Sequence, residues 1–155
     1  MTRLKLEDLA HEVMTVLPQI NRLMAVELRQ EVDDSATMPQ FRVLAYLHEA
    51  PMTLTALAQK RRVSLQSAGE LVQALVARGW VLRTPDPSDR RQSILELTDE
   101  GRTNYARVQN RMQEQLTAYL ALLTDTERDT VQGALIALQR VIQTQDSGVV
   151  IDDSK

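Results

Sequence analysis

Residues 80–97 read Trp80-Val81-Leu82-Arg83-Thr84-Pro85-Asp86-Pro87-Ser88-Asp89-Arg90-Arg91-Gln92-Ser93-Ile94-Leu95-Glu96-Leu97. The two ends of this stretch are short runs of apolar and β-branched residues, which favour β-strands. Its middle is rich in Pro, Asp and Ser, the residues that form turns. The stretch therefore predicts a two-stranded hairpin, with strands at 80–83 and 93–97 and a polar tip that carries consecutive arginines.

Two short helices joined by a tight turn are predicted directly before the hairpin. The first begins after Thr53, and Ser64 is a suitable N-cap for the second. Gly79 suits the left-handed residue that follows a helix. The second helix is expected to turn an apolar face to the core, formed by Leu65, Ala68, Leu71, Val72, Leu75 and Val76. Helix, turn, helix and hairpin in this order predict a winged helix-turn-helix, whose second helix can enter the major groove of duplex DNA.

Further helices are predicted on both sides of this lobe. Apolar residues at spacings of three and four predict a helix from Leu6 to about residue 32, with a kink or a break near Val16 because Pro18 lacks a backbone donor. Thr37 can cap another helix, which ends before Pro51. The chain is predicted to be helical again from 99 to about 123 and from 124 to about 144, where a capping box fits the sequence.

Composition excludes several classes of protein. The chain has 155 residues, of which 43% are hydrophobic and 25% charged, as expected for one globular domain. It has no cysteine, which excludes disulfides, thiolate metal sites and cysteine-based redox sensing. No stretch is as long and apolar as a membrane span, and the start lacks a signal segment. We therefore expect a cytoplasmic protein with no membrane partner.

The charges are segregated along the chain. Residues 53–92 carry seven cations and three anions, a net charge of +4, whereas the remainder carries eleven cations and eighteen anions, a net charge of −7. A locally basic segment inside an acidic protein is compatible with binding to nucleic acid. The acidic total also leaves open a winged helix that serves only as a protein-interaction module.

Nothing in the sequence predicts catalysis or a cofactor. There is no Gly-rich phosphate loop, and neither His11 nor His48 is paired with a nucleophile at a recognised spacing. The two histidines also do not form a close-spaced pair of metal ligands. We therefore expect a protein that is not an enzyme and that uses no cofactor and no metal.

Four segments carry a resemblance to a known family. They are Leu54-Thr55-Ala56-Leu57-Ala58, Leu75-Val76-Ala77-Arg78-Gly79-Trp80-Val81, Asp86-Pro87-Ser88-Asp89-Arg90-Arg91 and Leu97-Thr98-Asp99-Glu100-Gly101. With them, nearly the whole chain resembles the MarR family of bacterial regulators. The resemblance implies a mainly α fold with a small β-hairpin wing, that is, a winged helix-turn-helix flanked by N- and C-terminal dimerisation helices.

The resemblance also implies partners and domain limits. It implies an obligate homodimer that represses nearby genes at a pseudo-palindromic DNA operator and is released by a small, often aromatic and anionic, effector. We expect one MarR-like unit over 1–145, with dimerisation helices at about 5–32 and 99–144 and the winged lobe at about 37–98. The terminal helices have little of their own domain to pack on, which also favours dimerisation. Residues 146–155 are expected to form a flexible tail.

Candidate base contacts lie on the second helix of the lobe. Gln66 and Ser67 are expected in its exposed first turns and Gln73 further along the same face, where amide and hydroxyl groups can reach base edges. Ser64 can cap the helix, contact a phosphate, or do both. Glu70 on the same face would repel phosphate unless it accepts a hydrogen bond from a cytosine amino group.

Candidate backbone and minor-groove contacts are cationic. Arg61 and Arg62 in the turn, and Arg78 at the end of the second helix, suit phosphate neutralisation. Arg91 most resembles the family arginine that enters the minor groove. Asp89 is expected to brace it through a charge-assisted pair, with Arg90 contacting phosphate or taking the minor-groove position itself.

An effector pocket is implied only by the resemblance. In the family it lies between the dimerisation helices and the DNA-binding lobe, which makes Arg22, Phe41 and His48 the candidates here. The alternative is that Phe41 is a core residue and that Arg22 and His48 are ordinary surface residues.

Overall fold

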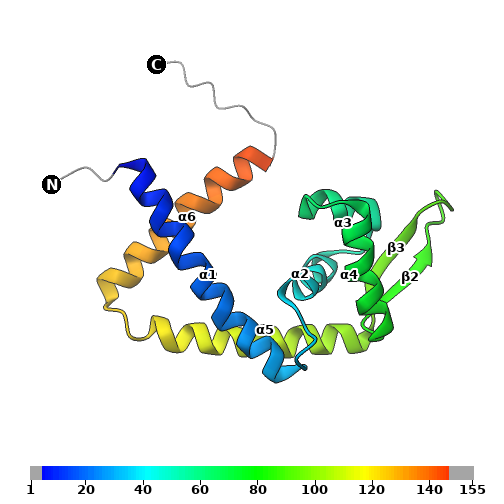
Figure 1. Ribbon diagram of the computed structural model, residues 1–155, viewed down its shortest axis with the longest axis horizontal. Coiled ribbons are helices and arrows are strands. Elements are labelled where there is room, and N and C mark those ends of the chain that lie inside the picture. The colour runs from blue at the N-terminus through cyan, green and yellow to red at the C-terminus, as the bar shows by residue number, and fades with distance from the viewer. Residues whose placement is uncertain (1–4, 147–155) are drawn as a thin grey trace, which may run out of the picture. The chain divides into compact units, whose positions relative to one another are not determined.

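A computed structural model describes residues 5–146, with side chains to residue 144, as six helices and three strands (Figure 1). The chain divides into two compact units, one ending at Gln113 and the other beginning at Glu114. In chain order the elements are α1 (Leu6–Glu31), α2 (Met38–Glu49), β1 (Met52–Thr53), α3 (Leu54–Arg61), α4 (Leu65–Ala77), β2 (Val81–Pro85), β3 (Ser93–Leu97), α5 (Asp99–Leu120) and α6 (Asp125–Asp146). The mainly helical fold with a small β wing is confirmed. The predicted tail lies, from residue 147 onward, outside the described residues.

Polar side chains begin the helices at the positions that the sequence predicts. Thr37 Oγ1 accepts from the backbone of Gln40 at 3.4 Å, and the Gln40 side chain accepts in return from Thr37 N at 3.2 Å. Thr124 and Glu127 form the same reciprocal pair at the start of α6, and these hydrogen bonds lower the pKa of Glu127. Each box satisfies backbone N–H groups that have no partner inside the helix.

Helix α4 ends as predicted on a left-handed glycine. Gly79 has a φ of 74°, its backbone N–H donates to Val76 O, and that of Trp80 donates to Leu75 O. This pair of hydrogen bonds closes the last turn and redirects the chain into β2.

Helix α1 is continuous through Pro18, so of the two predicted alternatives near Val16, a kink or a break, the break is wrong. Proline removes one hydrogen bond from the helix. In a helix of 26 residues the turns on both sides of Pro18 keep the chain helical despite that loss.

The wing is part of a three-stranded antiparallel sheet with the order β1-β3-β2. Strand β2 pairs with β3 from Val81↔Leu97 to Pro85↔Ser93, which confirms the predicted hairpin. The third strand, β1, pairs Met52 with Leu95 and was not predicted. Its two residues are too few to show an alternating pattern in the sequence.

The core of the first unit lies between α2, α4 and the sheet. Its largest fully buried side chains are Leu44, Leu47, Leu57, Leu75, Leu95, Val43, Val72 and Val108. Leu65, which was predicted on the inner face of α4, is 53% exposed instead. It is the first residue of α4, where the helix has not yet reached the core, and periodicity alone does not reveal this.

The junction between the sheet and α5 requires a glycine. Thr98 N donates to Trp80 O at 3.0 Å, and Thr98 Oγ1 donates to Gly79 O at 2.6 Å. Gly101 is then held so close that a Cβ at this position would lie 2.0 Å from Trp80 O. The segment Leu97-Thr98-Asp99-Glu100-Gly101 therefore brings the start of α5 against Trp80, just after the end of α4.

Both terminal helices expose large apolar side chains. In α1, Leu9 is 48% and Leu17 52% exposed. In α6, Leu135 is 61% and Leu138 46% exposed. No helix in the described part of the chain is long and apolar enough to cross a membrane.

Candidate nucleic-acid interface

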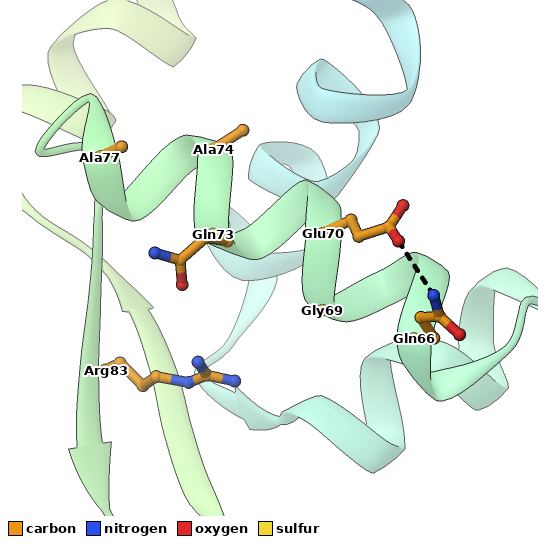
Figure 2. A pocket seen from close by; sticks show the side chains of 7 residues that line it. All are labelled: Gln66, Gly69, Glu70, Gln73, Ala74, Ala77 and Arg83. Carbon is orange, nitrogen blue, oxygen red and sulfur yellow. Dashed lines mark hydrogen bonds between the residues drawn. The ribbon is translucent and has the colours of Figure 1, made fainter.

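The outward face of α4 forms one wall of an open groove of about 640 Å³ (Figure 2). Arg83 of β2 lies across from this wall and extends alongside the helix. The groove is lined by Gln66, Gly69, Glu70, Gln73, Ala74, Ala77 and Arg83. The predicted residues Gln66 and Gln73 thus share one surface with Arg83, which the sequence alone does not single out among the cations.

The start of α4 is held by a serine pair. Ser64 Oγ accepts from Ser67 N at 3.1 Å, which confirms that Ser64 is the N-cap. The Ser64 hydroxyl also donates to Ser67 Oγ at 2.9 Å. Both hydroxyls are therefore exposed beside the positive end of the helix dipole, a position that favours anions.

The cations of the turn between α3 and α4 are not equivalent. Arg62 adopts a left-handed conformation with a φ of 51° and is exposed. Arg61 is half-buried, and its Nη1 atom is buried without a hydrogen-bond partner among the described residues. Lys60 Nζ lies 5.7 Å from the centroid of the Tyr46 ring. Of the two predicted arginines, Arg62 is the more accessible.

Two aspartates shape the tip of the wing. Asp86 Oδ1 accepts from the backbone and the hydroxyl of Ser88, at 2.9 and 2.7 Å, and these bonds lower the pKa of Asp86. Asp89 Oδ1 accepts from Arg91 N at 3.0 Å. The predicted ion pair between Asp89 and the Arg91 guanidinium is not among the contacts of the described residues. Asp89 braces the backbone of the turn, which leaves the side chains of Arg90 and Arg91 exposed.

The wing lines a second, smaller recess of about 130 Å³ beside the first residues of α3 and α4. Arg83 lines both this recess and the groove, and Arg91 lines the recess with it. The residues around it are Leu54, Thr55, Leu65, Arg83, Arg91, Gln92 and Ser93. Arg83 and Arg91 thus line the same recess. The sequence signal for Arg83 was only its place in the basic segment, at the end of a predicted strand.

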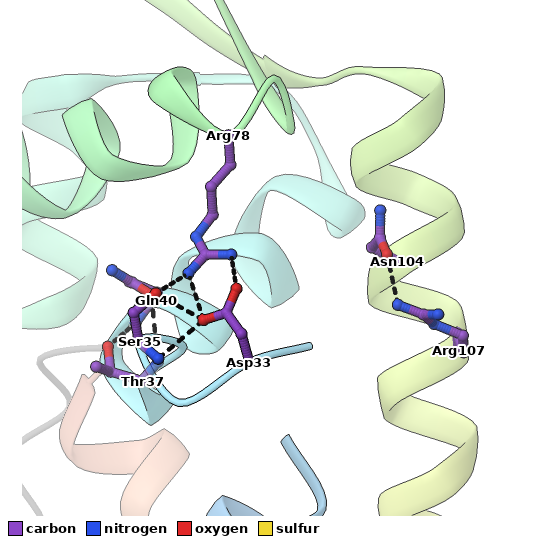
Figure 3. A network of polar contacts seen from close by, with 7 residues as sticks. All are labelled: Asp33, Ser35, Thr37, Gln40, Arg78, Asn104 and Arg107. Atoms are coloured by element: carbon purple, nitrogen blue, oxygen red, sulfur yellow. Dashed lines mark hydrogen bonds and ion pairs between the residues drawn. The ribbon is translucent and has the colours of Figure 1, made fainter. Parts of the chain in front are cut away.

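Arg78, a predicted phosphate contact, forms an ion pair and hydrogen bonds within the protein (Figure 3). Its guanidinium binds both carboxylate oxygens of Asp33, at 2.8 and 3.0 Å, and also donates to Ser35 Oγ. It lies 5.2 Å from the centre of the Trp80 ring. Hydrogen bonds from Arg78 and Ser35 hold the pKa of Asp33 well below its usual range. Arg78 therefore ties the loop after α1 to the end of α4.

Comparisons with known proteins agree with this geometry. The MarR family profile matches residues 36–92, which hold α2 to α4 and most of the wing. The chain is 31% identical over 104 residues to YsmB of Bacillus subtilis, named as an HTH-type transcriptional regulator, and the match covers 66% of this chain and 71% of that protein. The chain belongs to the MarR family.

Other relatives match over different lengths. The chain is 33% identical over 87 residues to an HTH-type transcriptional regulator of Mycobacterium tuberculosis, which is 56% of this chain and 61% of that protein. The chain thus spans about three fifths of the length of the first curated relatives that it matches. A mutant MarR of E. coli, solved in complex with operator DNA, superposes with a TM-score of 0.68 at 26% identity, over 84% of this chain and 92% of that one.

In this MarR-family chain, two of the three effector candidates meet at one tyrosine. Phe41 stacks on Tyr105 with ring centroids 5.2 Å apart, and His48 lies 4.7 Å from the same ring. Burial raises the pKa of Tyr105. Phe41 is also a buried core residue, whereas Arg22 is exposed on α1. Tyr105 was missed because residues 57 apart in the sequence, His48 and Tyr105, give no local signal of their contact.

Proposed function

We propose that this chain is a DNA-binding transcriptional regulator, a cytoplasmic bacterial repressor that binds a pseudo-palindromic operator as a homodimer. The observation that carries the proposal is the groove along α4, which has Arg83 on its far side. Arg83 also lines the recess that Arg91 of the wing lines. A helix at such a surface fits the major groove, and arginines on a β wing fit phosphates or a narrow minor groove. The MarR of E. coli solved with operator DNA supports the same use of the fold.

Each predicted contact has a place in this proposal. Gln66, Ser67 and Gln73 face the bases, and Ser64 faces a phosphate at the start of α4. Arg61, Arg62 and Arg90 neutralise phosphates, and Arg91 enters the minor groove from a turn that Asp89 holds. Arg83 is added to the proposed DNA contacts. Arg78 is not proposed to contact DNA, because the ion pair with Asp33 already neutralises its charge.

The exposed apolar residues of the terminal helices support the homodimer. Leu9 and Leu17 of α1 and Leu135 and Leu138 of α6 are each at least 46% exposed in one chain. Apolar side chains exposed at this density are normally covered by a partner. A two-fold dimer covers them and supplies the second recognition helix that a pseudo-palindromic operator needs.

The proposed regulation is a shift between two dimer conformations. DNA binds the form whose recognition helices lie about 34 Å apart, one turn of duplex. An effector lodged beside Phe41, His48 and Tyr105, with Arg22 as its counter-ion, favours a form with a different spacing. Equal spacing with and without a bound effector would contradict this mechanism.

The test is fluorescence anisotropy with the DNA that flanks the protein's own gene and a scrambled duplex of equal length, each at two salt concentrations. We expect the native duplex to bind at least about 1,000-fold more tightly than the scrambled one, with two subunits per site. Arg91→Ala should weaken binding and reduce its salt dependence without changing the dimer. Equally weak binding of both duplexes would favour the protein-interaction module instead.

A further inference from the structure

Glu70 is an unusual residue for the groove that it lines. It is the only acidic residue among those around the groove, where the other polar side chains are Gln66, Gln73 and Arg83. A carboxylate brought close to a polyanion raises the electrostatic energy of the complex. Its presence on this face therefore calls for a specific partner on the DNA.

A hydrogen bond within α4 sets the orientation of this carboxylate. Gln66 Nε2 donates to Glu70 Oε1 at 3.3 Å, one helical turn away (Figure 2). One N–H group of the Gln66 amide is thus used in the hydrogen bond to the Glu70 carboxylate. What the pair offers to a ligand is mainly acceptors, namely the second oxygen of Glu70 and Oε1 of Gln66.

The shape of the groove beside Glu70 allows a close approach. Gly69, Ala74 and Ala77 line it with small side chains or none. A Cβ at Gly69 would meet only Leu54 Cδ2, at an ordinary contact distance of 3.9 Å, so the fold does not require glycine there. Glycine nevertheless weakens a helix interior relative to alanine. Its presence is explained if a ligand comes close to the backbone at this point.

In the major groove, an acceptor can be matched only by the amino groups of cytosine and adenine. Adenine presents its N7 acceptor next to its amino group, which repels a carboxylate, whereas cytosine carries no second acceptor on that edge. We propose that Glu70, oriented by Gln66, selects a C·G base pair in the operator by accepting from the cytosine amino group. The inference rests on the proposed function.

A purely structural role for the pair makes a different prediction. Polar pairs at this spacing stabilise a helix slightly. If the hydrogen bond served only α4, removing it would lower the thermal stability and leave the preference for DNA sequence unchanged. Sequence preference therefore separates the two roles.

The experiment is selection of duplexes from a randomised pool by the full-length protein, followed by sequencing. Wild type is compared with Glu70→Gln and Gln66→Ala, and with Glu12→Gln, which makes the same charge change at an exposed position of α1. We expect wild type and Glu12→Gln to prefer C·G about tenfold at one position of each half-site. Glu70→Gln should lose that preference or move it to A·T, because glutamine pairs with adenine, and should bind scrambled duplex more tightly. Gln66→Ala should weaken the preference at the same position.

Two outcomes separate failure of this inference from failure of the function. If Glu70→Gln selects the same base at every position as wild type, the inference is overturned and the DNA-binding function stands. If wild type enriches no sequence at all, the proposed function itself is overturned, and the inference with it.

Discussion

The winged lobe and helix α6 use their apolar residues in opposite ways. In the lobe, the apolar stripe of α4 is buried, with Val72 and Leu75 both 0% exposed. In α6, Leu135 and Leu138 have the same spacing of three residues but are 61% and 46% exposed. The two apolar stripes are alike in sequence. They differ in whether another element of the same chain packs against them. The lobe is complete within one chain, whereas α6 carries a surface that a second molecule can cover.

Among substitutions that add a methyl group, the largest effect is expected at Gly101. In Gly101→Ala the new Cβ would lie 2.0 Å from Trp80 O, so α5 and the end of α4 must move apart. We expect the free energy of unfolding to fall by about 3 kcal/mol. Chemical denaturation followed by circular dichroism measures this. A loss below about 0.5 kcal/mol would show that the junction is not close-packed.

Leucine substitutions compare the two stripes directly. Leu75→Ala in the lobe should lower the free energy of unfolding by about 2 to 5 kcal/mol, because it leaves a cavity in a closed core. Leu135→Ala in α6 should act instead on association, weakening the proposed homodimer and making the melting temperature more dependent on concentration. Analytical ultracentrifugation separates the two effects. If the wild-type protein is a monomer, Leu135→Ala has no association to weaken, and the predicted difference between the two leucine substitutions is contradicted.

A smaller effect on the melting temperature is expected from breaking one ion pair in each region, Asp33–Arg78 at the end of α4 and Asp125–Arg128 in α6. Because the pKa of Asp33 is lowered in the folded protein, its contribution to stability is present above the unfolded pKa of about 3.9 and is lost as the pH falls below it. Asp33→Asn should therefore lower the melting temperature at pH 7 and matter progressively less below about pH 4. The control is Asp125→Asn, which breaks the exposed i,i+3 pair with Arg128 in α6. It should change the melting temperature little. A difference between wild type and Asp33→Asn that is constant from pH 7 to pH 3 would contradict this account.

The smallest effect is expected at Gly133 of α6. A Cβ at this position would have no atom within 4 Å in one chain, and alanine is the better helix former. Gly133→Ala should stabilise the protein by about 1 kcal/mol. A loss of stability accompanied by a weaker dimer would instead place Gly133 where a second chain approaches closely.

Local chemistry made much of the fold predictable. The caps at Thr37, Ser64 and Thr124 and the left-handed Gly79 act within a few residues of themselves, so each was visible in the sequence and is confirmed. The hairpin was predictable for the same reason. Strand β1 was not, because its existence depends on a partner more than forty residues away.

The candidate site was predictable only in part, because charge and exposure do not show what a side chain contacts. Arg78 and Arg83 look alike in sequence, but Asp33 neutralises the first while the second lines the groove. Asp89 was correctly placed in the wing, but it holds the backbone of Arg91 rather than its guanidinium. The contacts that distinguish these residues join segments far apart in the chain or depend on the turn geometry.

Hydrogen bonds and periodicity over a few residues specify the order of helices and strands and the tip of the wing, so these features can be predicted from the amino-acid sequence, as can the position of the basic segment. The folded structure is needed to show which arginine is accessible to a ligand, that Gly101 must lack a side chain, and that Glu70 and Arg83 line one groove. Those properties depend on which segments pack together, and packing is a property of the whole fold.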